Sequence, residues 1–330
     1  MKLGRVFLGL LFLPSALPSV SLPRQAQDPI RVQTTLVNVP VLLSDRQGGS
    51  VLGLKAEDFA LYDDGVRQPL AFFAAATEPV RVALLLDTSK SMTADLDRIR
   101  KAASGFIPQL RPQDQAMVVS FDADIRVLCR LSSDGDELKR AVRSAAIGEY
   151  VGTKMRDAVT LVVEKHLRTV RGRAAIILLS DGQDFGSRSS PEDVIRTVTD
   201  SGVVVYPVFY RVDRRVLAKK LFGISLPRTS AGGGTSWEAE VKAAANGLRR
   251  IAEESTGAFY ESEKTDLKKT FSRIAEELRH QYLLAFYPDP SRLDGRHHSI
   301  QVTASRPELA VRSRRGYQAG RDLRWFLSRN

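Results

Sequence analysis

The stretch VALLLDTSKS, residues 82–91, places a carboxylate and several hydroxyl groups directly after an uninterrupted apolar run. Such a run is typical of a buried strand in a parallel sheet, because helices cover both faces of these sheets. Open α/β sheets bind their ligands at the carboxyl ends of the strands. The sequence therefore predicts a ligand site that begins at Asp87.

Two further oxygen-bearing residues follow in comparable positions. Thr153 lies in a loop ahead of a predicted helix, Lys154–Val170, and Asp181 directly follows the apolar run of residues 176–179 and Ser180. Hydroxyl and carboxylate oxygens suit a hard divalent cation such as Mg²⁺ far better than a soft one. The candidate metal site consists of Asp87, Ser89, Ser91, Thr153 and Asp181.

Each of these residues also has a purely structural interpretation. Ser91 could cap a helix predicted from Asp95 to Leu110, and Thr153 could cap the helix that follows it. Asp181 with Gly182 could form a turn. The turn at residues 87–91, Thr153 and Asp181 follow one another along the chain, each on a strand end or a loop. Their joint occurrence favours the metal site.

The arrangement resembles the metal-ion-dependent adhesion site (MIDAS) of von Willebrand factor type A (VWA) domains, whose DxSxS motif is matched at residues 87–91. The resemblance implies that Ser89, Ser91 and Thr153 touch an Mg²⁺ or Mn²⁺ ion. It implies that Asp87 and Asp181 act mainly through bound waters or ligand hydrogen bonds. An Asp or Glu side chain of a partner protein would complete the coordination.

The loops around this site carry further expectations. Asp184 matches the DGxxD form of the same family, and we expect it to shape the loop without binding the metal. Val151 stands where the family usually has glycine, so the loop before Thr153 should be less flexible than usual. Thr153 itself is expected to be an exposed loop residue.

Strands and helices alternate from about residue 80 to residue 278, which predicts an α/β fold with a doubly wound, mostly parallel sheet. The connection at residues 122–124 is too short for a parallel crossover, so Ile125–Leu131 should form an antiparallel edge strand. An irregular insertion, residues 211–245, is predicted to be a mobile loop with a short helix around Trp237–Ala244.

The two ends of the chain are predicted to form one small β-rich domain that flanks the VWA domain. The predicted segments are a signal peptide (1–21), a leader (22–29), a β-rich segment (30–78), the VWA domain (79–280), C-terminal strands (281–317) and a basic tail (318–330). This layout also resembles the VWFA-related domain family of exported bacterial proteins.

The first residues predict export. Lys2 and Arg5 precede an apolar stretch, Val6–Leu17, that is too short to span a bilayer as a helix of ~20 residues. Cleavage after about Ser21 would leave no transmembrane span; the alternative is an uncleaved anchor. The destination would be periplasmic or extracellular. Cys129 is the single cysteine, so no intrachain disulfide can form, and we expect a buried, inert thiol.

The formal net charge of +11 falls to 11 − 2 = +9 when Lys2 and Arg5 are removed with the signal peptide. Export and the scattered basic residues argue against a nucleic-acid partner. Two interpretations of the basic residues stay open: a solvated face, or attraction to anionic envelope polymers and hence association with the envelope surface.

Catalysis has little support in the sequence. None of the four histidines belongs to an H-E-x-x-H motif, and no G-x-S-x-G motif is present, so each histidine is interpreted as a surface or cap residue. We therefore expect a binding module and no enzyme. Two alternatives stay open: a structural envelope protein whose metal site rigidifies a loop, and a metal-dependent hydrolase.

Overall fold

The computed structural model describes residues 36–47, 49–168, 172–212, 223–224, 234–261, 267–292 and 294–319. The predicted signal peptide and leader, and most of the predicted basic tail, lie outside these residues. Within the described part, none of the helices combines the length and the apolar character that crossing a bilayer requires.

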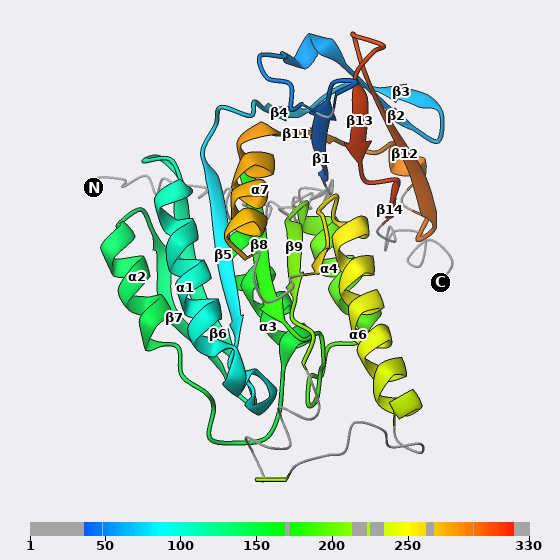
Figure 1. The fold of residues 1–330 in the computed structure, drawn as a ribbon. Coiled ribbons are helices and arrows are strands. Elements are labelled where there is room, and N and C mark those ends of the chain that lie inside the picture. Colours follow the sequence, from blue (N-terminus) through cyan, green and yellow to red (C-terminus); the bar gives the residue numbers. More distant parts are fainter. Residues whose placement is uncertain are drawn as a thin grey trace, which may run out of the picture. The chain divides into compact units, whose positions relative to one another are not determined.

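A six-stranded sheet forms the centre of the α/β part (Figure 1). In spatial order its strands are β10 (Tyr260–Glu261), β9 (Val204–Phe209), β8 (Arg173–Ser180), β5 (Val80–Asp87), β6 (Gln115–Phe121) and β7 (Ile125–Ser132). Neighbouring strands are parallel except β6 and β7, which are antiparallel. The predicted fold class is confirmed, including the antiparallel edge strand.

Helices cover both faces of this sheet (Figure 1). One face carries α1 (Leu96–Phe106), α2 (Gly135–Ser144) and α7 (Leu267–His280). The other carries α3 (Met155–Val162), α4 (Pro191–Ser201) and α6 (Gly234–Glu254). Along β5, Leu84 packs into the first core and Leu85 into the second, because successive strand residues point to opposite faces. The two buried faces explain why the strand is apolar without interruption.

Local sequence sets the bounds of α4. The Ser190 hydroxyl accepts a hydrogen bond from the Asp193 backbone amide, and the Asp193 carboxylate accepts one from the Ser190 amide, which forms a capping box. Pro191 occupies the first turn, where its missing amide proton is not needed. Gly202, with φ of 71°, ends the helix in the left-handed conformation.

The prediction for the insertion was wrong in its second half. Residues 234–254 form the single 21-residue helix α6, where we expected a mobile loop up to residue 245 with only a short helix around Trp237–Ala244. The segment is rich in alanine, glutamate, lysine and arginine, which favour helix. The remaining part of the insertion lies mostly outside the described residues.

Strands from both ends of the chain pair with one another in two four-stranded sheets. The first sheet has the order β13 (Ala310–Ser313), β1 (Val37–Ser44), β11 (Gln281–Phe286) and β4 (Phe72–Ala74). The second has the order β14 (Gly316–Gln318), β12 (His297–Ala304), β2 (Phe59–Asp63) and β3 (Val66–Gln68). Both sheets contribute to one apolar core, so the predicted β-rich part formed from both chain ends is present.

Candidate metal centre

Asp87 is the last residue of β5, and its fully buried carboxylate organises the turn that follows. Its Oδ1 accepts hydrogen bonds from the backbone amide of Ser89 at 2.9 Å and from the Ser89 hydroxyl at 2.5 Å. Its Oδ2 accepts a bond of 2.6 Å from the hydroxyl of Ser180, the last residue of β8. Asp87 therefore links two neighbouring strand ends and fixes the orientation of Ser89.

Ser89 and Ser91 present their hydroxyl groups side by side, with 3.0 Å between the two Oγ atoms. Ser89 is the N-cap of a 3₁₀ turn, Lys90–Ala94, that contains Ser91 and precedes α1, and the residue at the N-cap of α1 is Asp95. Ser91 therefore does not cap α1, and the structural alternative for this serine is excluded.

Asp181 follows β8 and lies beside the Asp87 turn, almost completely buried. Burial raises the pKa of its carboxyl group. Hydrogen bonds from Ser91 and from the Gln183 backbone amide lower that pKa, but burial outweighs them. Burial likewise raises the pKa of Asp87, and the nearby charge of Asp181 raises it further. Two buried carboxylates thus lie close together, and repulsion between them disfavours the doubly charged state.

Thr153 lies in the loop before α3 and is joined to the loop that follows Asp181. The prediction that Thr153 is exposed was wrong, because only 7% of its surface is accessible. Its backbone forms an antiparallel bridge with Phe185, with both N–H to O distances at 2.9 Å. Its hydroxyl forms no hydrogen bond with any residue in the described part of the chain. The backbone bridge therefore holds Thr153 in place and leaves its hydroxyl oxygen available as a metal ligand.

A second network that the sequence interpretation missed supports the same loops. The Thr88 hydroxyl donates to Asp122 at 2.8 Å, and Arg126 holds both carboxylate oxygens of Asp122, at 2.6 and 3.1 Å. The Asp122 carbonyl accepts from the Lys154 amide at 2.8 Å. The sequence signal was the short β6–β7 turn that contains Asp122, which we used only to infer strand direction.

Asp184 shapes the loop after β8, as expected from its position. Its carboxylate accepts from the Arg156 backbone amide at 2.8 Å, from the Arg156 guanidinium at 2.9 Å and from the Ser187 hydroxyl at 2.8 Å. These contacts tie the loop to the start of α3. Both carboxylate oxygens of Asp184 already accept hydrogen bonds from Arg156 or Ser187. We therefore do not count Asp184 among the candidate metal ligands.

The donor set fits a hard divalent cation. In the described part of the chain, no basic side chain forms an ion pair with Asp87 or Asp181. Buried carboxylates are normally paired or bound to a metal, because an isolated buried charge is costly. Serine and threonine hydroxyls with carboxylates are the oxygen ligands that Mg²⁺ and Mn²⁺ prefer. Ser89, Ser91 and Thr153 would hold such an ion, with Asp87 and Asp181 compensating its charge.

A different acidic group, in the β-rich part, brings Asp63, Asp64 and His298 within 4.8 Å of one another. The interpretation of His298 as a surface or cap residue was wrong, because its side chain is buried and bonds to Asp64 at 2.8 Å. Arg292 lies 2.7 Å from Asp64 and 3.6 Å from Asp63. The chain thus supplies its own cations here, in contrast to the Asp87 site, and the group is an ion-pair cluster.

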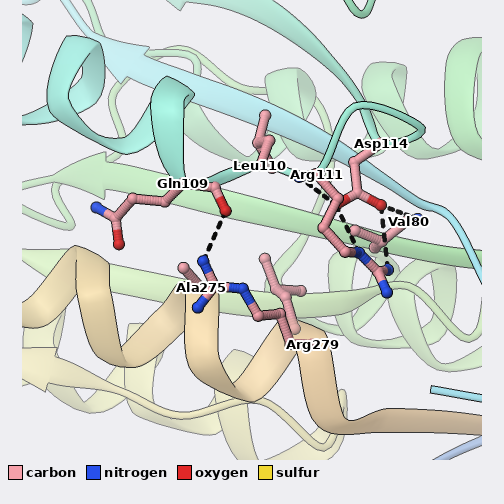
Figure 2. A pocket seen from close by; sticks show the side chains of 8 residues that line it. Val80, Gln109, Leu110, Arg111, Asp114, Ala275 and Arg279 are labelled. Carbon is pink, nitrogen blue, oxygen red and sulfur yellow. Dashed lines mark hydrogen bonds and ion pairs between the residues drawn. The ribbon is translucent and has the colours of Figure 1, made fainter. Parts of the chain in front are cut away.

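Two cavities among the described residues lie away from the candidate metal site. A cavity of about 10 Å³ at the opposite end of β5 has room for at most one water (Figure 2). Its polar groups are already paired: Arg279 donates to the Gln109 carbonyl at 2.8 Å, and Asp114 pairs with Arg111 at 3.1 Å. A hollow of about 490 Å³ lies between α1 and α7, and none of its lining residues belongs to the candidate site.

Comparisons with solved structures give similar folds at low identity. An aerotolerance-related membrane protein from Bacteroides fragilis is 17% identical with a TM-score of 0.46, over 60% of this chain and 98% of that one. A von Willebrand factor type A protein from Catenulispora acidiphila is 13% identical with a TM-score of 0.45, over 89% of this chain and 76% of that one. Proximal thread matrix protein 1 from the mussel byssus, with zinc in its MIDAS motif, is 16% identical with a TM-score of 0.47. That match covers 65% of this chain and 48% of that one.

Among curated proteins, none matches the chain. The sequence profile of the von Willebrand factor type A domain, however, matches residues 82–273, more than half of the chain. This range begins within β5 and ends within α7, so it covers the six-stranded sheet and the helices on both of its faces. On this match the chain belongs to the von Willebrand factor type A domain family.

Proposed function

We propose that this chain is an exported, metal-dependent protein-binding module. An Mg²⁺ or Mn²⁺ ion is held by Ser89, Ser91 and Thr153, with Asp87 and Asp181 behind it, and an Asp or Glu side chain of a partner protein completes its coordination. The family and the fold are consistent with this role.

One observation carries the proposal. Asp87 and Asp181 are buried carboxylates without a basic partner among the described residues, and they lie at the carboxyl edge of a parallel sheet beside three hydroxyl-bearing residues. A divalent cation supplies the missing positive charge. Because hydroxyl ligands are neutral, the ion stays electrophilic toward an incoming carboxylate. The net charge of 11 − 2 = +9 without the signal peptide favours encounter with an acidic partner.

The arrangement favours binding over catalysis. Metal-dependent hydrolysis requires a general base near the ion, and the hydrogen-bond partners of the five site residues include no histidine or glutamate in the described part of the chain. His298, which bonds to two carboxylates, belongs to the separate ion-pair cluster of the β-rich part. A structural envelope protein with a loop-rigidifying metal site is the alternative that the experiment below separates from adhesion.

The test is capture of partners on the immobilised full chain in Mg²⁺ and in EDTA, repeated with Thr153→Ala in Mg²⁺. Removing the Thr153 hydroxyl should preserve the fold, because that hydroxyl has no hydrogen bond to a described residue. We expect EDTA and Thr153→Ala to abolish the same captured proteins. Thr303→Ala on β12 is the control and should capture like the unaltered protein. An identical captured set in all four cases would refute adhesion and favour the structural role.

Export is supported by the basic and apolar pattern of the first 21 residues. Mass spectrometry of the native protein should find a mature N-terminus near Leu22. An intact Met1 on a cytosolic product would exclude export.

A further inference from the structure

Three large apolar side chains are exposed on the loops that carry the candidate metal residues. The accessible fractions are 67% for Tyr150, 79% for Val151 and 71% for Phe185. Tyr150 and Val151 precede Thr153 by three and two residues, and Phe185 is the residue bridged to Thr153. Exposed apolar side chains gathered at one place on a surface commonly mark an interaction site.

The bridge fixes where the Phe185 side chain starts. Thr153 and Phe185 exchange both backbone hydrogen bonds, as residues of a hydrogen-bonded antiparallel pair do. The two side chains of such a pair lie on the same side, with their Cβ atoms about 5 Å apart. The side chain of Phe185 therefore leaves the backbone directly beside the side chain of Thr153.

Both loops are held in place by contacts that do not involve the exposed side chains. The Phe185 loop is tied down by Asp184, which accepts bonds from the Arg156 amide and guanidinium. The other loop is tied down at Gly148, whose amide donates to the Thr88 carbonyl at 2.9 Å, and at Lys154, whose amide donates to the Asp122 carbonyl at 2.8 Å. The apolar groups are thus preorganised, which lowers the entropy cost of binding to them.

The same surface also carries positive charge. Lys90 lies between the two metal-site serines, and Lys154 directly follows Thr153. The Lys154 side chain runs beside Gly186, where its Cγ would lie 3.9 Å from an added Cβ, so it lies next to the Phe185 loop. Apolar contact area and positive charge therefore occur together around the metal site.

We propose that the ligand of this site is a peptide segment in which an aliphatic or aromatic side chain lies within two positions of the metal-binding Asp or Glu. The carboxylate reaches the ion, and the apolar neighbour packs on Phe185 and Val151, with Tyr150 at the edge. This inference rests on the proposed function, because it assigns the ligand class of the same site. Rigid aromatic side chains are common among the residues that dominate binding energy.

The test uses a phage-displayed library of 12-residue peptides, selected on the full chain in Mg²⁺ and in EDTA. The unaltered protein should enrich, in Mg²⁺ alone, peptides that combine an acidic residue with an apolar residue one or two positions away. A Val151→Ser, Phe185→Ser double variant should keep the acidic preference and lose the apolar one. Its affinity for the best selected peptide should fall about tenfold or more, the loss expected for a dominant contact.

Val127→Ser is the matched control, because Val127 is also exposed but lies on the edge strand β7. It should select the same peptides as the unaltered protein. The double variant should keep its melting temperature and its Mg²⁺ binding, since both side chains are exposed. Acidic peptides without an apolar preference, or an apolar preference that survives in the double variant, would overturn this inference and leave the proposed function intact. Absence of any Mg²⁺-dependent acidic enrichment would overturn the proposed function itself.

Discussion

Both ring nitrogens of His298 face carboxylates, Nδ1 at 2.8 Å from Asp64 and Nε2 at 3.1 Å from Asp294. Burial alone would lower the pKa of His298, but the two carboxylates outweigh burial and raise that pKa above its usual value of 6.5. Conversely, the hydrogen bonds from His298 and Ser299 lower the pKa of Asp64 from 3.8. The charged imidazolium and the charged carboxylate thus stabilise each other.

This pair predicts a pH window for stability. The contribution of His298 to the free energy of unfolding is fully present below pH 6.5 and is lost as the pH rises through the raised pKa of the folded state. The contribution of Asp64 is present above pH 3.8 and is lost as the pH falls through its lowered folded-state pKa. His298→Gln should therefore destabilise the protein more at pH 5.5 than at pH 8.5, as measured by urea unfolding. His297→Gln, at the exposed neighbouring position, should show no such difference; equal losses at both pH values for His298→Gln would contradict the assignment.

Single residues of the candidate site were predictable where the signal is local in sequence. Asp87, Ser89 and Ser91 occupy one turn, and Ser180 and Asp181 occupy one strand end, so the apolar runs before them indicated their place at the sheet edge. His298 and Asp64 are 234 residues apart and meet only because β12 pairs with β2. No local pattern contains that pairing, so the cluster was missed.

At the scale of elements, Gly257 sets how closely α6 and β10 approach β9. A Cβ at Gly257 would lie 1.9 Å from the Val205 carbonyl oxygen, which is backbone and cannot move aside alone. Gly257→Ala should therefore lower the free energy of unfolding by about 2–3 kcal/mol, the cost of overpacking a core contact. Calorimetric or denaturant unfolding measures it.

Gly247 provides the matched control within α6. An added Cβ there meets nothing within 4 Å, and the position is an exposed helix interior. Gly247→Ala should stabilise the protein by roughly 0.5–1 kcal/mol, because glycine loses more backbone entropy than alanine in a helix. If both alanine variants changed stability equally, close packing at Gly257 would not be the cause.

The bounds of elements were predictable where connection length or capping chemistry decides them. The direction of β7 followed from a turn too short for a parallel crossover, and α4 begins and ends at its capping residues. α6 was predicted poorly because a glycine-rich run next to it suggested a loop, although Ala243 and its neighbours favour helix. The prediction that Thr153 is exposed was wrong for a different reason. Its burial depends on a bridge to a loop 32 residues away, which no local pattern indicates.

At the scale of the whole molecule, buried Arg173 connects the central sheet to the segments that lead into the β-rich strands. From the first position of β8 it donates to the carbonyl groups of Ala76, Glu78 and Leu278. Burial lowers the pKa of its guanidinium to about 10. The segment before β5 and the last turn of α7 are thereby held by one side chain.

Arg173→Met should leave these carbonyl groups without their donor. Because each buried unsatisfied group costs about 1–3 kcal/mol, we expect the free energy of unfolding to fall by about 3 kcal/mol or more. Arg67→Met, at an exposed position on β3, should change it by less than about 0.5 kcal/mol. Denaturant unfolding measures both variants. Equal free energies of unfolding for Arg173→Met and Arg67→Met would show that the buried guanidinium does not hold these segments.

Metal binding links the candidate site to the stability of the whole chain. An ion that binds only the folded protein stabilises it by mass action, by about 2.7 kcal/mol when its concentration is 100 times the dissociation constant. Burial raises the pKa of both Asp87 and Asp181, and the charge of Asp181 raises that of Asp87 further, so a bound cation would stabilise their charged forms. EDTA should therefore lower the melting temperature, and Mg²⁺ or Mn²⁺ should restore it.

The most direct measurement is calorimetric titration of Mg²⁺ and Mn²⁺ into the metal-free full chain. The chain contains its own control, because Ser291 donates to Asp289 through both its amide, at 2.8 Å, and its hydroxyl, at 2.6 Å, as Ser89 does to Asp87, but at an exposed turn. We predict one bound ion for the unaltered protein and for the Asp289→Ala, Ser291→Ala variant, and none for the Asp87→Ala, Ser89→Ala variant. Equal binding of the ion by the unaltered protein and the Asp87→Ala, Ser89→Ala variant would contradict the account.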